Sequence, residues 1–315
     1  WALIVQAIVG TGLSTLLLWW SSSWRPRFVY SRASLRELRG MSAAVFGSNL
    51  LFYVNRNVDN ILISRFLGPA ALGLYSVAYN AMLVPLLRLV SPVQQVFFPA
   101  FARLERPGEV GALWVRVTRA TSALTVPAFV GLAVVAPELV AVVLGSKWHG
   151  AARILQVLAV VGVLQGVAWH TRNVLMALGR AQTIFRYSVV SAVLTVTAFA
   201  IGVTQGVVAV AVAYAVVTIV LTPAYIRLAT QATGLSLLRF ARPLAGVFVA
   251  AALMGLALLG LRALLVDELA AAPRLVLLVL AGTALYVPLA AWLAPGLRDE
   301  LRDLRARRRG AATPV

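Results

Sequence analysis

The chain has 315 residues, of which 61% are hydrophobic and only 12% are charged. Soluble domains are about half apolar and about a quarter charged, so this composition excludes an ordinary soluble protein and indicates an integral membrane protein. The formal net charge of +18 would suggest nucleic-acid binding in a soluble chain. Here the basic residues lie in short segments beside apolar runs, so we expect no nucleic-acid partner.

The apolar runs predict an all-α, polytopic helical membrane protein with about nine transmembrane helices. A helix of about 20 apolar residues crosses the hydrocarbon core, and the alternating segments of a membrane barrel are missing from the sequence. Glycine, proline and arginine separate the runs, as in "LGPAALG" and "LERPGEVG". The predicted spans cover about 1–20, 41–66, 71–101, 113–135, 151–178, 183–203, 206–229, 243–265 and 273–294.

The first run, residues 1–20, has no basic segment before it and no small-residue cleavage site, so it does not read as a signal peptide. We interpret the chain as a fragment that lacks upstream helices. The polar connector 21–40 predicts a surface helix over "SRASLRELRG", with Ser31 or Ser34 as its N-cap. Residues 136–150 predict an interfacial hairpin with a short re-entrant helix.

Arginines gather in alternate loops, which predicts the orientation in the membrane. One side receives most of them, including the tail 298–315, and the other side receives only Arg65, Lys147, Arg153, Arg262 and Arg274. Because basic loops stay on the cytoplasmic side, we expect a cytoplasmic C-terminus and a first span that starts outside.

A polar stripe crosses the second predicted span, "MSAAVFGSNLLFYVNRNVDNILISRF". At 100° per residue, Asn49, Tyr53, Arg56 and Asn60 fall within about 40° of one line, and Asp59 lies at its edge. Such a stripe must face a bundle interior or water. Two readings stay open: an Arg56–Asp59 ion pair with asparagines bonding between helices, or a hydrated translocation cavity where Arg56 attracts an anion.

The third predicted span carries a second cation, Arg88. Pro85, Pro92 and Pro99 recur every seven residues on the same face, which predicts a kinked helix that serves as a hinge. Alternatively, Arg88 extends to the lipid headgroups. His170 reads as an interfacial or hydrogen-bonded histidine rather than a proton relay. The two histidines fall on opposite sides of the membrane, so we expect no metal site.

The segment "GSNLLFYVNRNVDNILISRFLGPAALGLYSVAYNAMLVPL" resembles the bacterial polysaccharide flippases, the Wzx-like branch of the multidrug/oligosaccharidyl-lipid/polysaccharide exporters. "FFPAFARL", "GSKWHGAARILQVLAVVGVLQG" and "NVLMALGRAQ" are similar to later parts of that family. The resemblance implies one half of a two-lobed bundle of 12 or 14 helices. Residues 1–20 would end the first lobe, 21–40 connect, 41–235 form the second lobe, 236–297 add two helices, and 298–315 form a basic cytoplasmic tail.

The resemblance also implies a function: flipping of undecaprenyl-pyrophosphate-linked oligosaccharide across the inner membrane for polysaccharide biosynthesis, by alternating access coupled to an ion gradient. It points to Arg56 and Asp59, and also to Arg88. In this reading the arginines attract the pyrophosphate, Asn49, Asn55, Asn60 and Tyr53 face the sugars, and Asp59 binds H⁺ or Na⁺. Membrane lipids and the polysaccharide polymerase machinery are further expected partners. Neither a cofactor nor enzymatic activity is expected.

Two alternatives remain. A multidrug-type exporter of cations calls for uncompensated acids in the cavity, and Asp59 is the one intramembrane acid that the sequence suggests. A membrane-embedded polymerase or ligase needs a catalytic constellation, and the outer loops offer only Glu138, Asp267 and Glu268, without a matching histidine or metal set.

Overall fold

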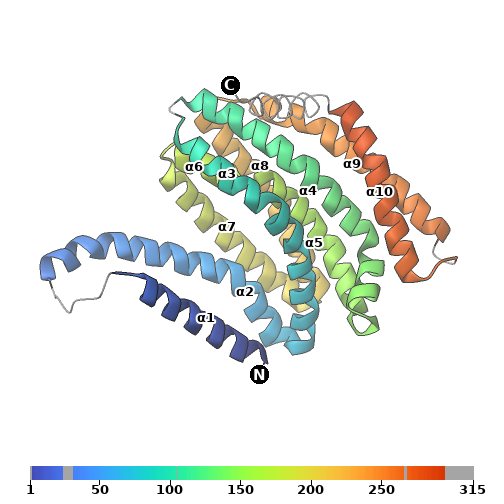
Figure 1. Cartoon of the computed structure of the whole chain (residues 1–315), viewed down its shortest axis with the longest axis horizontal. Helices are drawn as coiled ribbons and strands as arrows, with labels where there is room; N and C mark the ends of the chain where they lie inside the picture. Colours follow the sequence, from blue (N-terminus) through green and yellow to red (C-terminus); the bar gives the residue numbers. More distant parts are fainter. Residues whose placement is uncertain (1, 24–30, 105, 266–267, 295–315) are drawn as a thin grey trace. The chain divides into compact units, whose positions relative to one another are not determined.

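The computed structural model describes residues 2–23, 31–104, 106–265 and 268–294, and all the secondary structure in these ranges is helical (Figure 1). Within them, the side chains of 2–4, 7, 33–52, 54–56, 96, 98–100 and 102 lie outside the described residues. The predicted all-α class is confirmed. The chain divides into two compact units, Trp1–Leu50 and Leu51–Val315, which we treat separately.

The first unit holds α1 (Ala2–Ser21) and the beginning of α2 (Arg32–Pro85). The described large side chains of α1, such as Ile8, Leu16 and Trp20, are exposed, as suits an apolar surface that meets lipid or protein. Helix α2 begins directly after Ser31, one of the two predicted N-cap positions. It does not end near residue 40, so the predicted surface helix and the span after it form one continuous helix.

A kink at Gly68 divides α2. Its φ of 85° and ψ of 174° are open to glycine and strained for other residues, and Pro69 follows with no N–H to donate. The predicted boundary at "LGPAALG" is therefore a kink and not a loop. The helix then reaches Pro85, where a π-helix, η1 (Leu86–Val90), leads into α3 (Ser91–Ala102). The helix is thus distorted after Pro85, whereas α3 continues through Pro92 and Pro99, and the predicted hinge stays a prediction.

Helix α4 (Pro107–Val143) lies at the centre of the second unit and contacts α5 (His149–Ala168), α9 and α10. The predicted hairpin over 136–150 is wrong. Helix α4 passes through Pro137 to Val143, and only η2 (Ser146–Trp148) separates it from α5. Buried Ala136 and Val140 continue the packed face of α4, so tertiary packing outweighs the proline.

The remaining helices are α6 (Thr171–Ala177), α7 (Ala181–Gly202), η3 (Val203–Gln205), α8 (Val207–Thr233), α9 (Leu237–Leu265) and α10 (Ala271–Leu293). Helix α7 packs on α8 and α8 on α5, while α9 and α10 pack on each other and on α4 (Figure 1). The last four long helices agree with the predicted spans to within a few residues, apart from α9, which begins six residues early. The predicted span 151–178 is broken into α5 and α6 at Trp169–His170.

In the described ranges, seven helices are long and apolar enough to cross a membrane, against about nine predicted. Two features account for the difference. Helix α1 (Ala2–Ser21) is 20 residues long, but only its stretch Ile8–Ser21 enters this count, because several side chains before Ile8 lie outside the described residues. The predicted spans 41–66 and 71–101 contribute one joined candidate, Asn57–Gln95, because Gly68 kinks the helix without ending it.

Candidate functional site

Asp59 is a buried acid in the second unit, with only 5% of its surface exposed. It lies on α2 between Val58 and Ile63, which are also buried. The backbone N–H of Asn60 donates a hydrogen bond to Asp59 Oδ1 over 2.8 Å. A carboxylate inside an apolar bundle is costly unless something neutralises it, so its surroundings indicate what it binds.

Asp59 lines a cavity of about 240 Å³. Helices α2, α5, α7 and α8 form most of its wall, together with η1 and the residue that caps α5. Asp59 is the one charged side chain among the described lining residues, and the others are Tyr79, Leu83, Leu87, Gln165, Trp169, Ser191, Thr195, Phe199 and Tyr214.

Hydrogen bonds and ring contacts fix this wall. Gln165 Nε2 donates to the Tyr214 hydroxyl over 2.7 Å, and Trp169 Nε1 donates to Gln94 Oε1. The rings of Phe199 and Tyr214 meet edge to face with their centres 5.5 Å apart. Hydroxyl, amide and carboxylate oxygens therefore surround a small space, and this set of ligands suits a proton or a hard cation.

The structure describes only part of the predicted polar stripe. Tyr53 is 64% exposed, and Asn60 is half-buried beside Asp59. The backbones of Asn49, Asn55 and Arg56 are helical in α2, but their side chains lie outside the described residues. The predicted ion pair between Arg56 and Asp59 stays a prediction.

Arg88 lies in η1 with an exposed side chain and is absent from the cavity wall. Its neighbour Leu87 lines the cavity instead. The π-helical turn after Pro85 therefore presents one residue to the cavity and directs the arginine elsewhere. Turns of this type recur at functional sites, because they change the register of the side chains.

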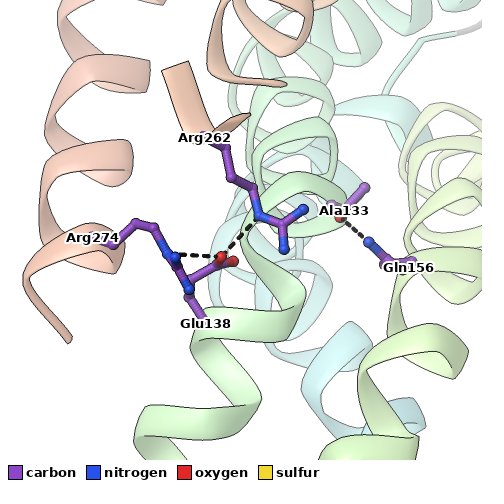
Figure 2. A network of polar contacts seen from close by, with 5 residues as sticks. All are labelled: Ala133, Glu138, Gln156, Arg262 and Arg274. Carbon is purple, nitrogen blue, oxygen red and sulfur yellow. Dashed lines mark hydrogen bonds and ion pairs between the residues drawn. The ribbon is translucent and has the colours of Figure 1, made fainter. Parts of the chain in front are cut away.

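A second polar cluster, which sequence reasoning missed, joins three helices (Figure 2). Glu138 of α4 is fully buried. Arg262 of α9 donates from Nε to Glu138 Oε1 over 2.8 Å, and Arg274 Nε of α10 forms an ion pair with the same oxygen at 3.1 Å. A weak signal was present in the sequence, because Glu138, Arg262 and Arg274 were all predicted on the membrane side with few basic residues.

Beside this cluster lies a larger apolar cavity of about 600 Å³ between α4, α9 and α10. Its wall includes Val135, Leu139 and Leu275, near Glu138 and Arg274 in the sequence. The Tyr286 hydroxyl, also on the wall, donates to the Ala123 carbonyl over 2.8 Å. In the described ranges, no three histidine, cysteine, aspartate or glutamate side chains come together as a metal site would require.

The apolar helices, together with a polar cavity and buried ions inside them, define a multi-pass α-helical membrane protein. Residues 1–153 match the family described as "Polysaccharide biosynthesis protein". Over these residues the chain is therefore similar to bacterial polysaccharide biosynthesis proteins, in line with the resemblance that its motifs indicated.

Three relatives illustrate the similarity. The teichuronic acid biosynthesis protein TuaB of Bacillus subtilis is 31% identical over 58% of this chain and 39% of its own length. The lipopolysaccharide biosynthesis protein WzxC of Escherichia coli is 31% identical over 64% and 42%. The succinoglycan biosynthesis transport protein ExoT of Rhizobium meliloti is 29% identical over 65% and 42%. The chain spans about two fifths of the length of these relatives. No solved structure matches it significantly.

Proposed function

We propose that this chain, as part of its complete protein, moves a lipid-linked oligosaccharide across the bacterial inner membrane for polysaccharide biosynthesis. The names of its relatives support the class of cargo, and one of these relatives is named a transport protein. The cargo would be an undecaprenyl-pyrophosphate lipid, and the movement would be a rocking of two lobes around a central cavity.

The observation that carries the mechanism is the small cavity around Asp59. Drug-sized ligands occupy pockets of about 300–1,000 Å³. A cavity of about 240 Å³ with one acid is better suited to a single cation than to a cationic drug. We therefore assign Asp59 to the coupling ion, H⁺ or Na⁺, whose binding would favour one state of the transporter over the other.

The anionic cargo requires cations elsewhere. Arg56 is assigned to the pyrophosphate, with Arg88 as a second contact, because guanidinium groups bind phosphate oxygens bidentately. Asn49, Asn55, Asn60 and Tyr53 are assigned to the sugar hydroxyls. The exposed Tyr53 is accessible to such a ligand.

The cellular setting follows from the same proposal. The protein lies in the inner membrane with its C-terminus in the cytoplasm, as the arginine distribution predicts. Membrane lipids surround it, and the polysaccharide polymerase machinery receives its product.

Complementation of a flippase-deficient strain with the complete gene tests the proposal. Wild-type protein should restore surface polysaccharide. Asp59→Asn, which keeps the shape and removes the charge, should lower production at least tenfold, and so should Arg56→Ala. Glu109→Gln, which removes an exposed acid at the start of α4, is the matched control and should keep production.

Each failure has a different meaning. A wild-type gene that restores nothing would overturn the proposed function. Restoration by wild type and Asp59→Asn alike would overturn only ion coupling at Asp59, and full activity in both Arg56→Ala and Arg56→Lys would remove Arg56 from the mechanism. Drug resistance without restored polysaccharide would support the multidrug exporter. Sugar transfer by the purified protein would support a membrane-embedded polymerase or ligase.

A further inference from the structure

Five buried polar side chains lie on α4, at the junction of α5 and α6, and on α6, and none of them is among the lining residues of the Asp59 cavity. Thr118 and Ser122 of α4, His170 at the junction and Thr171 of α6 are all fully buried, and Asn173 is 6% exposed. None of the described residues offers a hydrogen-bond partner to Thr118 Oγ1, Ser122 Oγ, Thr171 Oγ1, Asn173 Nδ2 or either ring nitrogen of His170.

The packing register brings these groups together. A Cβ added to Gly162 would lie 2.3 Å from the ring of Phe129, and one added to Gly166 would lie 2.9 Å from Thr125 Oγ1. A step of four residues toward the C-terminus of α5 therefore corresponds to a step of four residues toward the N-terminus of α4, as in two antiparallel helices. Carried on by one turn, to the α5–α6 break, this register would set His170 opposite the segment of Thr121 and Ser122.

Beyond the break, α6 still packs against this part of α4, since Val117 of α4 belongs to the same apolar cluster as Val174 of α6. Helices α4 and α6 are in contact. Residues 114, 118 and 122 share one face of α4, since they are four apart, and Trp114 Nε1 on that face also lacks a partner among the described residues.

Burying a polar group without a partner costs about 1–3 kcal/mol. Several such groups together would outweigh most of the stability of a domain, so they must be satisfied. The polar side chains named here are uncharged hydroxyl, amide, imidazole and indole groups, with no acid to hold a cation. Water, which bonds about three such groups at once, is the ligand that fits.

We propose that Thr118, Ser122, His170, Thr171 and Asn173 hold a cluster of internal water molecules at the α5–α6 break. The break lies within one candidate span, Ser146–Ala177, where backbone groups freed from the helix need partners in place of lipid. The site also adjoins the cavity wall, because Trp169, which lines the Asp59 cavity, directly precedes His170. The inference does not depend on the proposed function.

Radiolytic hydroxyl labelling of the purified protein tests this directly, because buried side chains are labelled where bound water lies beside them. Normalised to intrinsic reactivity, His170 and Trp114 should be labelled at least tenfold faster than Phe129, which is equally buried within an apolar cluster. Labelling of His170 and Trp114 as slow as that of Phe129 would overturn the proposal.

Isosteric substitutions give a second, independent sign. If the cluster is dry, Thr118→Val or Thr171→Val removes an unsatisfied hydroxyl and raises Tm. If it is hydrated, each variant breaks bonds to water, lowers Tm and slows the labelling of His170. Thr121→Val is the control. The Thr121 hydroxyl already donates to backbone carbonyls of α4, over 3.0 Å to that of Val117, so the labelling of His170 should be unchanged in this variant. A rise in Tm for Thr118→Val and Thr171→Val would contradict the proposal.

Discussion

The carboxylate of Glu138 is held by two guanidinium groups that come from two other helices. Its side chain has no exposed surface, and those of Arg262 and Arg274 are 27% and 13% exposed. Forming such a cluster adds little net stability, because desolvation offsets the attraction, but removing one partner leaves buried charge without compensation. The cluster therefore matters most when it is broken.

Glu138→Ala should lower the free energy of unfolding by about 3 kcal/mol, because Arg262 and Arg274 both lose their contact with a buried carboxylate. Thermal or denaturant unfolding in detergent measures this. Glu109→Ala is the matched control: its partner Arg106 is 3.8 Å away, and the two side chains are 50% and 84% exposed, so the change should stay within about 0.5 kcal/mol. Equal effects of the two variants would show that the buried cluster contributes nothing.

Sequence reasoning found Asp59 as an acid inside a span, because a charge among apolar residues is visible in the sequence alone. It could not find the residues that line the cavity together with that acid. Tyr79, Gln165, Thr195 and Tyr214 come from parts of the chain up to about 150 residues apart, and ordinary polar residues carry no mark of a shared cavity. Glu138 was assigned to a loop for the same reason, since its partners lie on helices far along the chain.

At the scale of helices, close approach of α4 and α5 depends on glycine. Gly162 faces Phe129, which is fully buried, so the ring has nowhere to move. Small residues let neighbouring helices approach closely in membranes, where van der Waals packing drives their association.

Gly162→Ala should therefore destabilise the protein by about 1–3 kcal/mol through overpacking, despite the better helix propensity of alanine. Gly131→Ala on α4 is the matched control, because an added Cβ there meets nothing within 4 Å, and it should be neutral or slightly stabilising. Unfolding midpoints of the two variants in the same detergent decide the matter. A stabilised Gly162→Ala would refute the close contact.

Hydropathy predicted helix positions well where glycine or charged residues end an apolar run, as at α7, α8 and α10. It failed where a helix continues through a residue that usually breaks it. Pro137 suggested a hairpin, but the packed face of α4 continues beyond it. Gly68 suggested a loop and gives only a kink. Tertiary packing decides whether a helix continues through such residues, and a short stretch of sequence does not reveal that packing.

At the scale of the whole molecule, the orientation in the membrane rests on the distribution of arginine. The loops on either side of α7 should lie on opposite sides of the membrane, because α7 is long and apolar enough to cross it. The chain contains no cysteine, so an introduced thiol has no competitor among these 315 residues, and the complete protein without an introduced thiol measures any other background.

Four exposed positions serve this purpose in the complete protein: Ser146 and Gln205 on the side with few arginines, and Gln182 and Gln231 on the basic side. A membrane-impermeant maleimide added to spheroplasts should label Ser146→Cys and Gln205→Cys at least tenfold faster than Gln182→Cys and Gln231→Cys, because basic loops stay in the cytoplasm. All four should react after lysis, which controls for buried thiols. Rapid labelling of Gln182→Cys in intact spheroplasts would reverse the orientation, and with it the cytoplasmic placement of the C-terminus.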